Sequence, residues 1–114
     1  MLHNQKKINL DIRFRLLTIL SDDPYITQRD LAKKLGISLG AVNYCLKELI
    51  VIGHIKANNF KKNTNKLRYL YLLTPLGIKE KALLANDFLK RKLSEYHALK
   101  AEIKSIQSDL KIKL

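Results

Sequence analysis

Apolar residues in the first fifth of the chain recur every three or four positions. They fall on one face of a helix, which is defined by Leu10, Phe14, Leu17 and Leu20. This period predicts an amphipathic helix over residues 6–21. The helix is expected to end before Pro24, because the Asp22-Asp23 pair and the proline interrupt the pattern and favour a turn.

A second pattern lies in RDLAKKLGISLGAVNYCLKEL, residues 29–49, where two apolar-periodic stretches flank Gly36. Thr27, followed three residues later by Asp30, is close to a capping box and predicts the start of a short helix. Gly36 predicts its end, because glycine readily takes the left-handed conformation that follows many helices. Ser38 is expected to cap the next helix. The residues predicted to face inward are Leu31, Ala32 and Leu35 in the first helix and Val42, Leu46 and Leu49 in the second.

The hydrophobic period changes after Gly53. Two stretches rich in β-branched, aromatic and leucine residues, His54–Asn58 and Leu67–Leu73, predict strands. The polar and basic sequence between them, NFKKNTNK, predicts a hairpin loop over residues 59–66.

Thr74-Pro75 marks the start of a last helix, because proline suits the first helical position. Nothing interrupts this helix until about Asp109, so it should run for roughly 35 residues, or about 50 Å. The order of elements predicts a mainly α chain with a small β-hairpin (α+β). This is a winged helix-turn-helix with a long C-terminal coiled-coil-like helix. We expect residues 1–77 to form a winged helix-turn-helix DNA-binding domain and residues 78–114 to form a dimerisation helix.

The charge of the chain favours a polyanionic partner. Its formal net charge is +12, and residues 25–77 hold nine basic and two acidic residues. Such a balance is typical of proteins that bind nucleic acid. The single cysteine, Cys45, excludes an internal disulfide and fits a reducing compartment. The sequence shows neither a signal peptide nor a stretch long enough to span a bilayer. We therefore expect a cytoplasmic protein that binds no membrane, and we expect its polyanionic partner to be double-stranded DNA.

Patterns for catalysis and metal binding are not found in the sequence. His3, His54 and His97 are far apart and have no cysteine or carboxylate at ligand spacing, and no glycine-rich phosphate loop occurs. The sequence therefore predicts no enzyme, no metal and no cofactor. Cys45 lies inside a predicted helix without an obvious base nearby, which favours a packed thiol; a redox sensor is the alternative.

The helix that begins at Ser38 carries the candidate base-reading residues. If Gln28 is the first position of a helix-turn-helix, three later residues fall at its characteristic positions. Ala32 is the small residue where the two helices cross, Gly36 makes the turn, and Val42 anchors the second helix on the first. The face away from Val42 begins with small, uncharged and amide-bearing residues, which suit a close approach to base edges in the major groove. The candidate DNA-binding residues are Ser38, Gly40, Ala41, Asn43, Tyr44 and Lys47. Alternatively, Tyr44 packs against the hairpin and Asn43 is only solvated.

The predicted hairpin supplies a second set of candidates. Basic and amide side chains there can enter the minor groove or grip phosphates: Lys61, Lys62, Asn63, Asn65, Lys66 and Arg68. The alternative is a solvated hairpin whose lysines discourage edge pairing. Gln28 and Arg29, at a helix N-terminus, are candidate phosphate contacts.

The last helix contains an apolar seam with alternating steps of four and three residues. The expected dimer interface comprises Ala85, Leu89, Lys92, Tyr96, Leu99, Ile103, Ile106 and Leu110. Such a repeat is typical of a coiled coil, and in a parallel pair Glu95 of one chain would face Lys100 of the other. The alternative is a helix folded entirely against its own domain. Because the pattern is longer than so small a domain can cover, we expect a homodimer through the C-terminal helix.

The strings LAKKLGISLGAVNYCLKEL and LTPLG, with the spacing of LIVIGHI, resemble MarR-family winged-helix regulators over roughly residues 10–100. More narrowly, SLGAVNYCLKELI and KLRYLYLLTPLGIKEKA are similar to the exopolysaccharide-associated branch of that family. The resemblance implies a transcriptional regulator acting on a pseudo-palindromic site near exopolysaccharide or capsule genes. Here NNFKKNTNK replaces the usual acidic-and-arginine wing motif, so lysines and asparagines would contact DNA. One long helix replaces the usual two C-terminal helices, which makes a small-molecule effector doubtful.

A winged-helix interaction adaptor is the competing hypothesis. It would recruit a protein through the coiled coil and bind nucleic acid without sequence preference. The weakly charged start of the helix at Ser38 argues against it, because an unspecific binder would gain more from lysine and arginine there.

Overall fold

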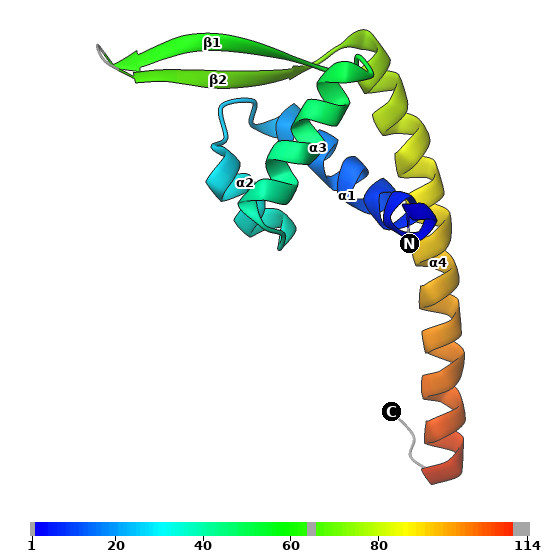
Figure 1. Cartoon of the computed structure of the whole chain (residues 1–114). Helices are drawn as coiled ribbons and strands as arrows, with labels where there is room; N and C mark the ends of the chain where they lie inside the picture. The colour runs from blue at the N-terminus through cyan, green and yellow to red at the C-terminus, as the bar shows by residue number, and fades with distance from the viewer. Residues whose placement is uncertain (1, 64–65, 111–114) are drawn as a thin grey trace. The chain divides into compact units, whose positions relative to one another are not determined.

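The computed structural model describes residues 2–63 and 66–110, with side chains over 10–59 and 69–110. Its elements are α1 (Leu2–Asp22), α2 (Gln28–Leu35), α3 (Leu39–Val51), β1 (Ile55–Asn63), β2 (Lys66–Leu73) and α4 (Pro75–Leu110). The predicted fold class is confirmed: the structure is mainly helical with one antiparallel hairpin, a winged helix and a long C-terminal helix (Figure 1).

The chain divides into two compact units, Met1–Leu84 and Ala85–Leu114. We call the first the winged unit. Within it, α1 contacts α2 and β2, while α3 contacts α2 and β1. Among the described residues, no helix has both the length and the apolar character needed to cross a membrane.

The core of the winged unit is built mainly by leucines of α1, α2 and α3. Leu16, Leu17 and Leu20 of α1 are buried with the predicted inward residues of α2 and α3. Two details of the α1 pattern were wrong. Leu10, expected to face inward, is 42% exposed, whereas Leu16 is fully buried. Leu10 lies about 10 Å along the axis from Leu17, so a shared helical face does not ensure shared burial.

The helix-turn-helix forms as its local sequence predicts. Thr27 Oγ1 accepts a hydrogen bond from the Asp30 backbone N–H at 3.0 Å and caps α2. Ser38 Oγ accepts one from the Ala41 N–H at 3.1 Å and caps α3. Gly36 between them has φ +68°, a left-handed conformation that side chains with a Cβ rarely adopt. These contacts fix the turn between the two helices.

The hairpin is longer than predicted. β1 and β2 pair from Ile55↔Leu73 to Asn63↔Lys66, with an irregularity between Lys61 and Asn63. The predicted loop over residues 59–66 is therefore wrong in extent, because strand pairing continues through polar residues once the register is set by the buried end. At that end, Ile55 and Tyr71 are buried.

The start of α4 is bonded to the turn between α3 and β1. The Thr74 hydroxyl donates to the Gly53 carbonyl and accepts the Gly77 N–H at 3.0 Å. The Thr74 N–H donates to the His54 carbonyl at 3.0 Å. Pro75 occupies the first helical position, as predicted. Leu84, further along α4, belongs to the core of the winged unit.

Candidate nucleic-acid interface

The exposed face of α3 is the centre of the candidate interface. Val42, Leu46 and Leu49 are buried, whereas the opposite face leaves Gly40, Tyr44 and Lys47 exposed and Asn43 half-buried. The Tyr44 side chain is 64% exposed, so within this chain it does not pack into the core. This face of α3 therefore offers a ligand two small residues, one amide, one phenol and one ammonium group. They belong to Gly40, Ala41, Asn43, Tyr44 and Lys47.

The first turn of α3 has room for a close approach. A Cβ atom built on Gly40 would meet nothing within 4 Å, so the protein itself does not require glycine there. Ala41 is half-buried. Ser38 is exposed, but its hydroxyl oxygen serves as the helix cap. This hydroxyl is therefore oriented by the α3 backbone before any ligand binds.

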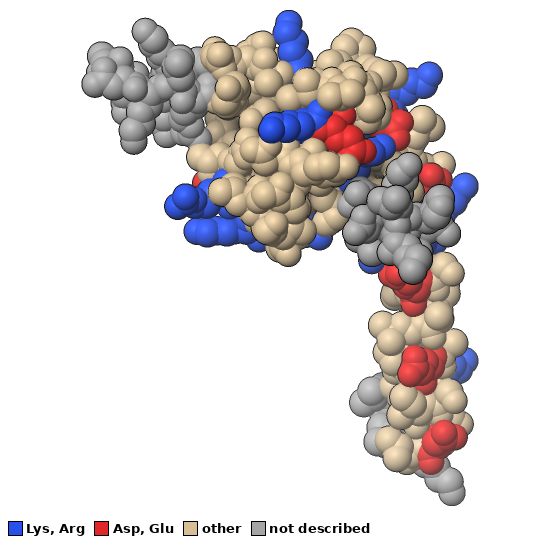
Figure 2. Space-filling model, viewed as in Figure 1, with Lys and Arg blue, Asp and Glu red and all other residues tan. Residues whose placement is uncertain are grey.

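The basic side chains of the winged unit extend beyond α3. Arg29, Lys33, Lys34 and Lys47 are all exposed, and Figure 2 shows lysine and arginine projecting from this unit at several places. The wing candidates Lys61, Lys62, Asn63, Lys66 and Arg68 lie on β1 and β2, but their side chains fall outside the described residues, as does the whole of Asn65.

Gln28, a predicted phosphate contact, is tied to the hairpin. Its Nε2 donates to the Tyr71 hydroxyl at 2.9 Å, and the Tyr71 N–H donates to the Pro24 carbonyl at 3.2 Å. Tyr71 thus joins β2 to the first residue of α2 and to the turn between α1 and α2. Sequence reasoning missed this role, although the alternation in LRYLYLL places Tyr69 and Tyr71 on one face. Arg29, the other predicted phosphate contact, is exposed on the first turn of α2.

The variant Tyr71→Phe should lower the free energy of unfolding by about 1 kcal/mol, since it removes one half-buried hydrogen bond and leaves the Gln28 amide to find another partner. The buried ring is retained. Thermal unfolding would measure the loss. Tyr69→Phe, which changes a 57% exposed ring on the same strand, is the matched control and should leave Tm unchanged. Equal Tm values for both variants would contradict a stabilising role of the Gln28 bond.

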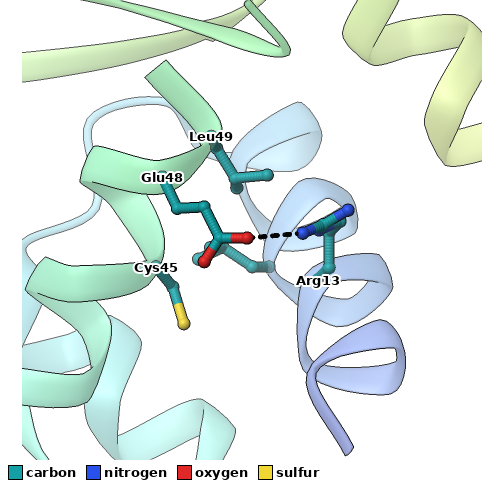
Figure 3. A pocket seen from close by; sticks show the side chains of 5 residues that line it. Arg13, Cys45, Glu48 and Leu49 are labelled. Atoms are coloured by element: carbon teal, nitrogen blue, oxygen red, sulfur yellow. Dashed lines mark hydrogen bonds and ion pairs between the residues drawn. The ribbon is translucent and has the colours of Figure 1, made fainter. Parts of the chain in front are cut away.

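Cys45 lines a small pocket between α1 and α3 (Figure 3), together with Arg13, Leu16, Glu48 and Leu49. Arg13 Nη2 lies 2.8 Å from Glu48 Oε1, one helical turn beyond the cysteine. Burial, and secondarily the Glu48 carboxylate, raise the pKa of the Cys45 thiol, whereas Arg13 lowers it. The net rise disfavours the reactive thiolate, which supports the packed-thiol hypothesis over the redox sensor.

Glu48→Gln should make Cys45 react faster with iodoacetamide at pH 8. Removing the carboxylate charge lowers the pKa of the thiol, so more thiolate is present at a fixed pH below that pKa. The pH profile of alkylation should shift toward lower pH. Arg13→Gln, which removes the opposite charge from the same ion pair, should shift it toward higher pH. Shifts in the same direction for both variants would indicate loosened packing instead of electrostatics.

The predicted dimer-interface residues lie along α4. Seven of them are exposed, and Ala85 is half-buried: Leu89, Lys92, Tyr96, Leu99, Ile103, Ile106 and Leu110. No described residue of α4 beyond Leu84 is buried. Among the side chains described, those of residues 10–59 and 69–110, no three from His, Cys, Asp or Glu are grouped to hold a metal ion.

Residues 10–56 match a family model described as winged helix-turn-helix DNA-binding. An HTH-type transcriptional regulator of Pyrococcus furiosus, described as uncharacterized, is 33% identical over 69 residues, which are 60% of this chain and 46% of that protein. The chain thus spans about half the length of this curated relative.

Solved structures share the fold. Lactococcus lactis ZitR, described as a zinc-responsive MarR family member, is 25% identical with a TM-score of 0.61, covering 87% of this chain and 72% of that one. A mutant of S. aureus MepR bound to an oligodeoxyribonucleotide is 22% identical with a TM-score of 0.59, covering 96% and 93%. The prediction that the chain is not an enzyme agrees with each of these matches. The chain has the winged helix-turn-helix fold, which it shares with a MarR-family regulator and with a protein solved on DNA.

Proposed function

We propose that this chain is a sequence-specific, double-stranded DNA-binding transcriptional regulator of the MarR type, acting as a homodimer on a pseudo-palindromic site. The observation that carries the proposal is the division of α3 into a buried face and an exposed face that begins with small and amide-bearing residues. The match of residues 10–56 to a winged helix-turn-helix DNA-binding model supports it.

In this proposal α3 enters the major groove with its N-terminal turns toward the bases. Gly40 and Ala41 let the backbone approach, and Asn43 pairs with a base through its amide. Lys47 reaches a phosphate or a guanine, and Tyr44 contacts a phosphate or a thymine methyl. Ser38 fixes the first turn of α3. Arg29 and Gln28 hold phosphates at the start of α2, and the wing lysines and asparagines bind the adjacent minor groove.

The DNA-binding part would comprise residues 1–77 and the dimerisation part residues 78–114. A two-fold dimer presents two recognition helices to half-sites about one DNA turn apart. The C-terminal helix supplies the contact between the two chains. The resemblance of SLGAVNYCLKELI and KLRYLYLLTPLGIKEKA to the exopolysaccharide-associated branch adds exopolysaccharide or capsule genes as the proposed targets.

Selection of bound fragments from a random duplex library tests this function. At physiological salt, specific affinity exceeds non-specific affinity by about a thousandfold or more, so a specific regulator enriches one motif. An enriched inverted repeat would support the proposal and locate target genes. Binding without enrichment would overturn it and favour a winged-helix adaptor that binds nucleic acid unspecifically.

Two substitutions separate base readout from phosphate binding. Asn43→Ala should cost about 1–3 kcal/mol on the selected site and relax the preference at one base position in each half-site. Lys62→Ala should weaken all sequences alike and reduce the slope of log affinity against log salt by about one. Titrations of the selected site and a scrambled duplex at several salt concentrations measure both effects. Indistinguishable behaviour of the two variants would contradict sequence readout by α3.

A further inference from the structure

The exposed stripe on the C-terminal half of α4 follows a heptad repeat. We label its inner positions a and d: a is taken by Leu89, Tyr96, Ile103 and Leu110, and d by Lys92, Leu99 and Ile106. Each of the six apolar members is between 47% and 62% exposed, although each is a large side chain. A run of this length that no described residue covers indicates a missing partner.

Part of this stripe is hollowed. A groove of about 430 Å³ is lined by Tyr96, Leu99, Lys100, Ile103, Lys104 and Gln107. Four of these residues, at successive a, d, e and a positions, form the kind of hole that accepts one side chain of a facing helix in a coiled coil. The groove therefore fits a helix with the same repeat.

The two edges of the stripe differ in charge. The g positions, one residue before each a position, hold Phe88 and then three acidic residues, Glu95, Glu102 and Asp109. The e positions, one residue after each d position, hold Leu93, Lys100 and Gln107, none of them acidic. Figure 2 shows acidic side chains at intervals along the long C-terminal helix. In a coiled coil, side chains at these edges select the orientation of the partner.

We infer that the occupant of this stripe is a second copy of the chain, in a parallel and in-register two-stranded coiled coil over residues 85–110; the inference rests on the proposed homodimer and adds its orientation. In a parallel pair each g position faces the next e position of the partner. Glu95 then meets the partner's Lys100 twice, once on each side, and Glu102 meets the partner's Gln107. Both contacts are favourable.

An antiparallel pair would bring like charges together. In an antiparallel pair each g position faces a g position of the partner. An arrangement centred on the stripe therefore sets Glu95 against the partner's Glu102 on both sides. Shifting the centre by half a heptad either way sets Glu95 or Glu102 against its own copy. Like charges at facing positions are destabilising, whereas opposite charges stabilise. The charge pattern thus selects the parallel arrangement.

Lys92 is the one inner residue that disfavours the parallel arrangement. A parallel pair places it beside the partner's Lys92, and the two positive charges repel each other. Contacts of Lys92 within its own helix would relieve this repulsion. Lys92 Nζ lies 3.1 Å from Glu95 Oε2 and 5.2 Å from the centre of the Phe88 ring. Both neighbours occupy g positions of the same helix, so the ammonium group is drawn to the edge while its methylene stem remains in the stripe.

Disulfide trapping tests the orientation in the full chain. In a Cys45→Ser background, Ile106→Cys supplies one thiol at a d position, which faces its own copy only in a parallel, in-register pair. In an antiparallel pair centred on the stripe, the two thiols would lie about 25 Å apart along the axis at 1.5 Å per residue, beyond the reach of a disulfide. Ala101→Cys, on the opposite face of α4, is the matched control.

After oxidation with copper phenanthroline, Ile106→Cys should yield about tenfold more covalent dimer than Ala101→Cys, because a disulfide needs facing Cβ atoms. Sedimentation without oxidation is measured in parallel. A non-covalent dimer that is not trapped through Ile106→Cys would overturn the parallel orientation while leaving the proposed dimer intact. A monomer in sedimentation at micromolar concentration would overturn both. Neither readout involves DNA, so failure of the DNA-binding proposal would be seen separately.

Discussion

A chain carrying Gly77→Ala is expected to be about 3 kcal/mol less stable than the wild type, with Tm lowered by about 10 °C or more. A Cβ atom on residue 77 would lie 1.9 Å from the His54 carbonyl oxygen and 2.9 Å from its carbon. This backbone cannot easily retreat, because the His54 N–H donates to Leu49 and the His54 carbonyl accepts the Thr74 N–H. Thermal and urea unfolding of the full chain measure the loss.

Gly40→Ala is the matched control for this substitution. Gly40 also lies in the first turn of a helix, but a Cβ atom there meets nothing within 4 Å. Alanine should therefore stabilise α3 by up to about 1 kcal/mol through helix propensity. The same variant should weaken DNA binding if α3 approaches bases closely. A wild-type Tm for Gly77→Ala would contradict the close packing of α4 against the backbone of His54.

Local features of the fold are predictable from sequence because their causes are local. Thr27 and Ser38 cap their helices through contacts three residues away, and Gly36 supplies a left-handed residue. The need for glycine at position 77 is different, because the atom that excludes a side chain belongs to His54, more than twenty residues earlier. The string LTPLG predicts a helix start but does not show what lies beside it.

The candidate site divides in the same way. The exposed face of α3 follows from helical periodicity, because one buried stripe fixes the position of the opposite face. The bond between Gln28 and Tyr71 spans more than forty residues and depends on how β2 lies against α2. The extent of β1 was also missed, because its Asn and Lys residues are poor strand formers and pair only in a register fixed elsewhere.

The helix α4 shows why periodicity cannot by itself identify a binding partner. Its apolar residues repeat at the same spacing from Ile78 to Leu110. Leu84, which is buried in the winged unit, lies outside this repeat, whereas Leu99 belongs to it and is 56% exposed. The period marks one apolar stripe of an amphipathic helix, but it does not show which apolar side chains the fold covers. Only the structure shows which of them the winged unit covers and which would need another chain.

A full chain carrying Leu99→Glu and Ile106→Glu is expected to sediment as a monomer and to bind its selected inverted repeat at least about a hundredfold more weakly, because two linked winged units gain at least that factor from simultaneous binding. Each substitution places a charge at an inner d position, where pairing would bury it without a counterion. Both positions are exposed in the single chain, so the winged unit should remain folded by circular dichroism.

The matched control is Ala101→Glu, which adds the same charge on the opposite face of α4. It should remain a dimer and retain wild-type affinity. Binding of a single half-site should be equal for the wild type and both variants, because one winged unit contacts it. If the double variant remained a dimer, the exposed stripe would not be the dimer contact. If it became a monomer yet bound the inverted repeat as tightly as the wild type, dimerisation would play no part in recognition.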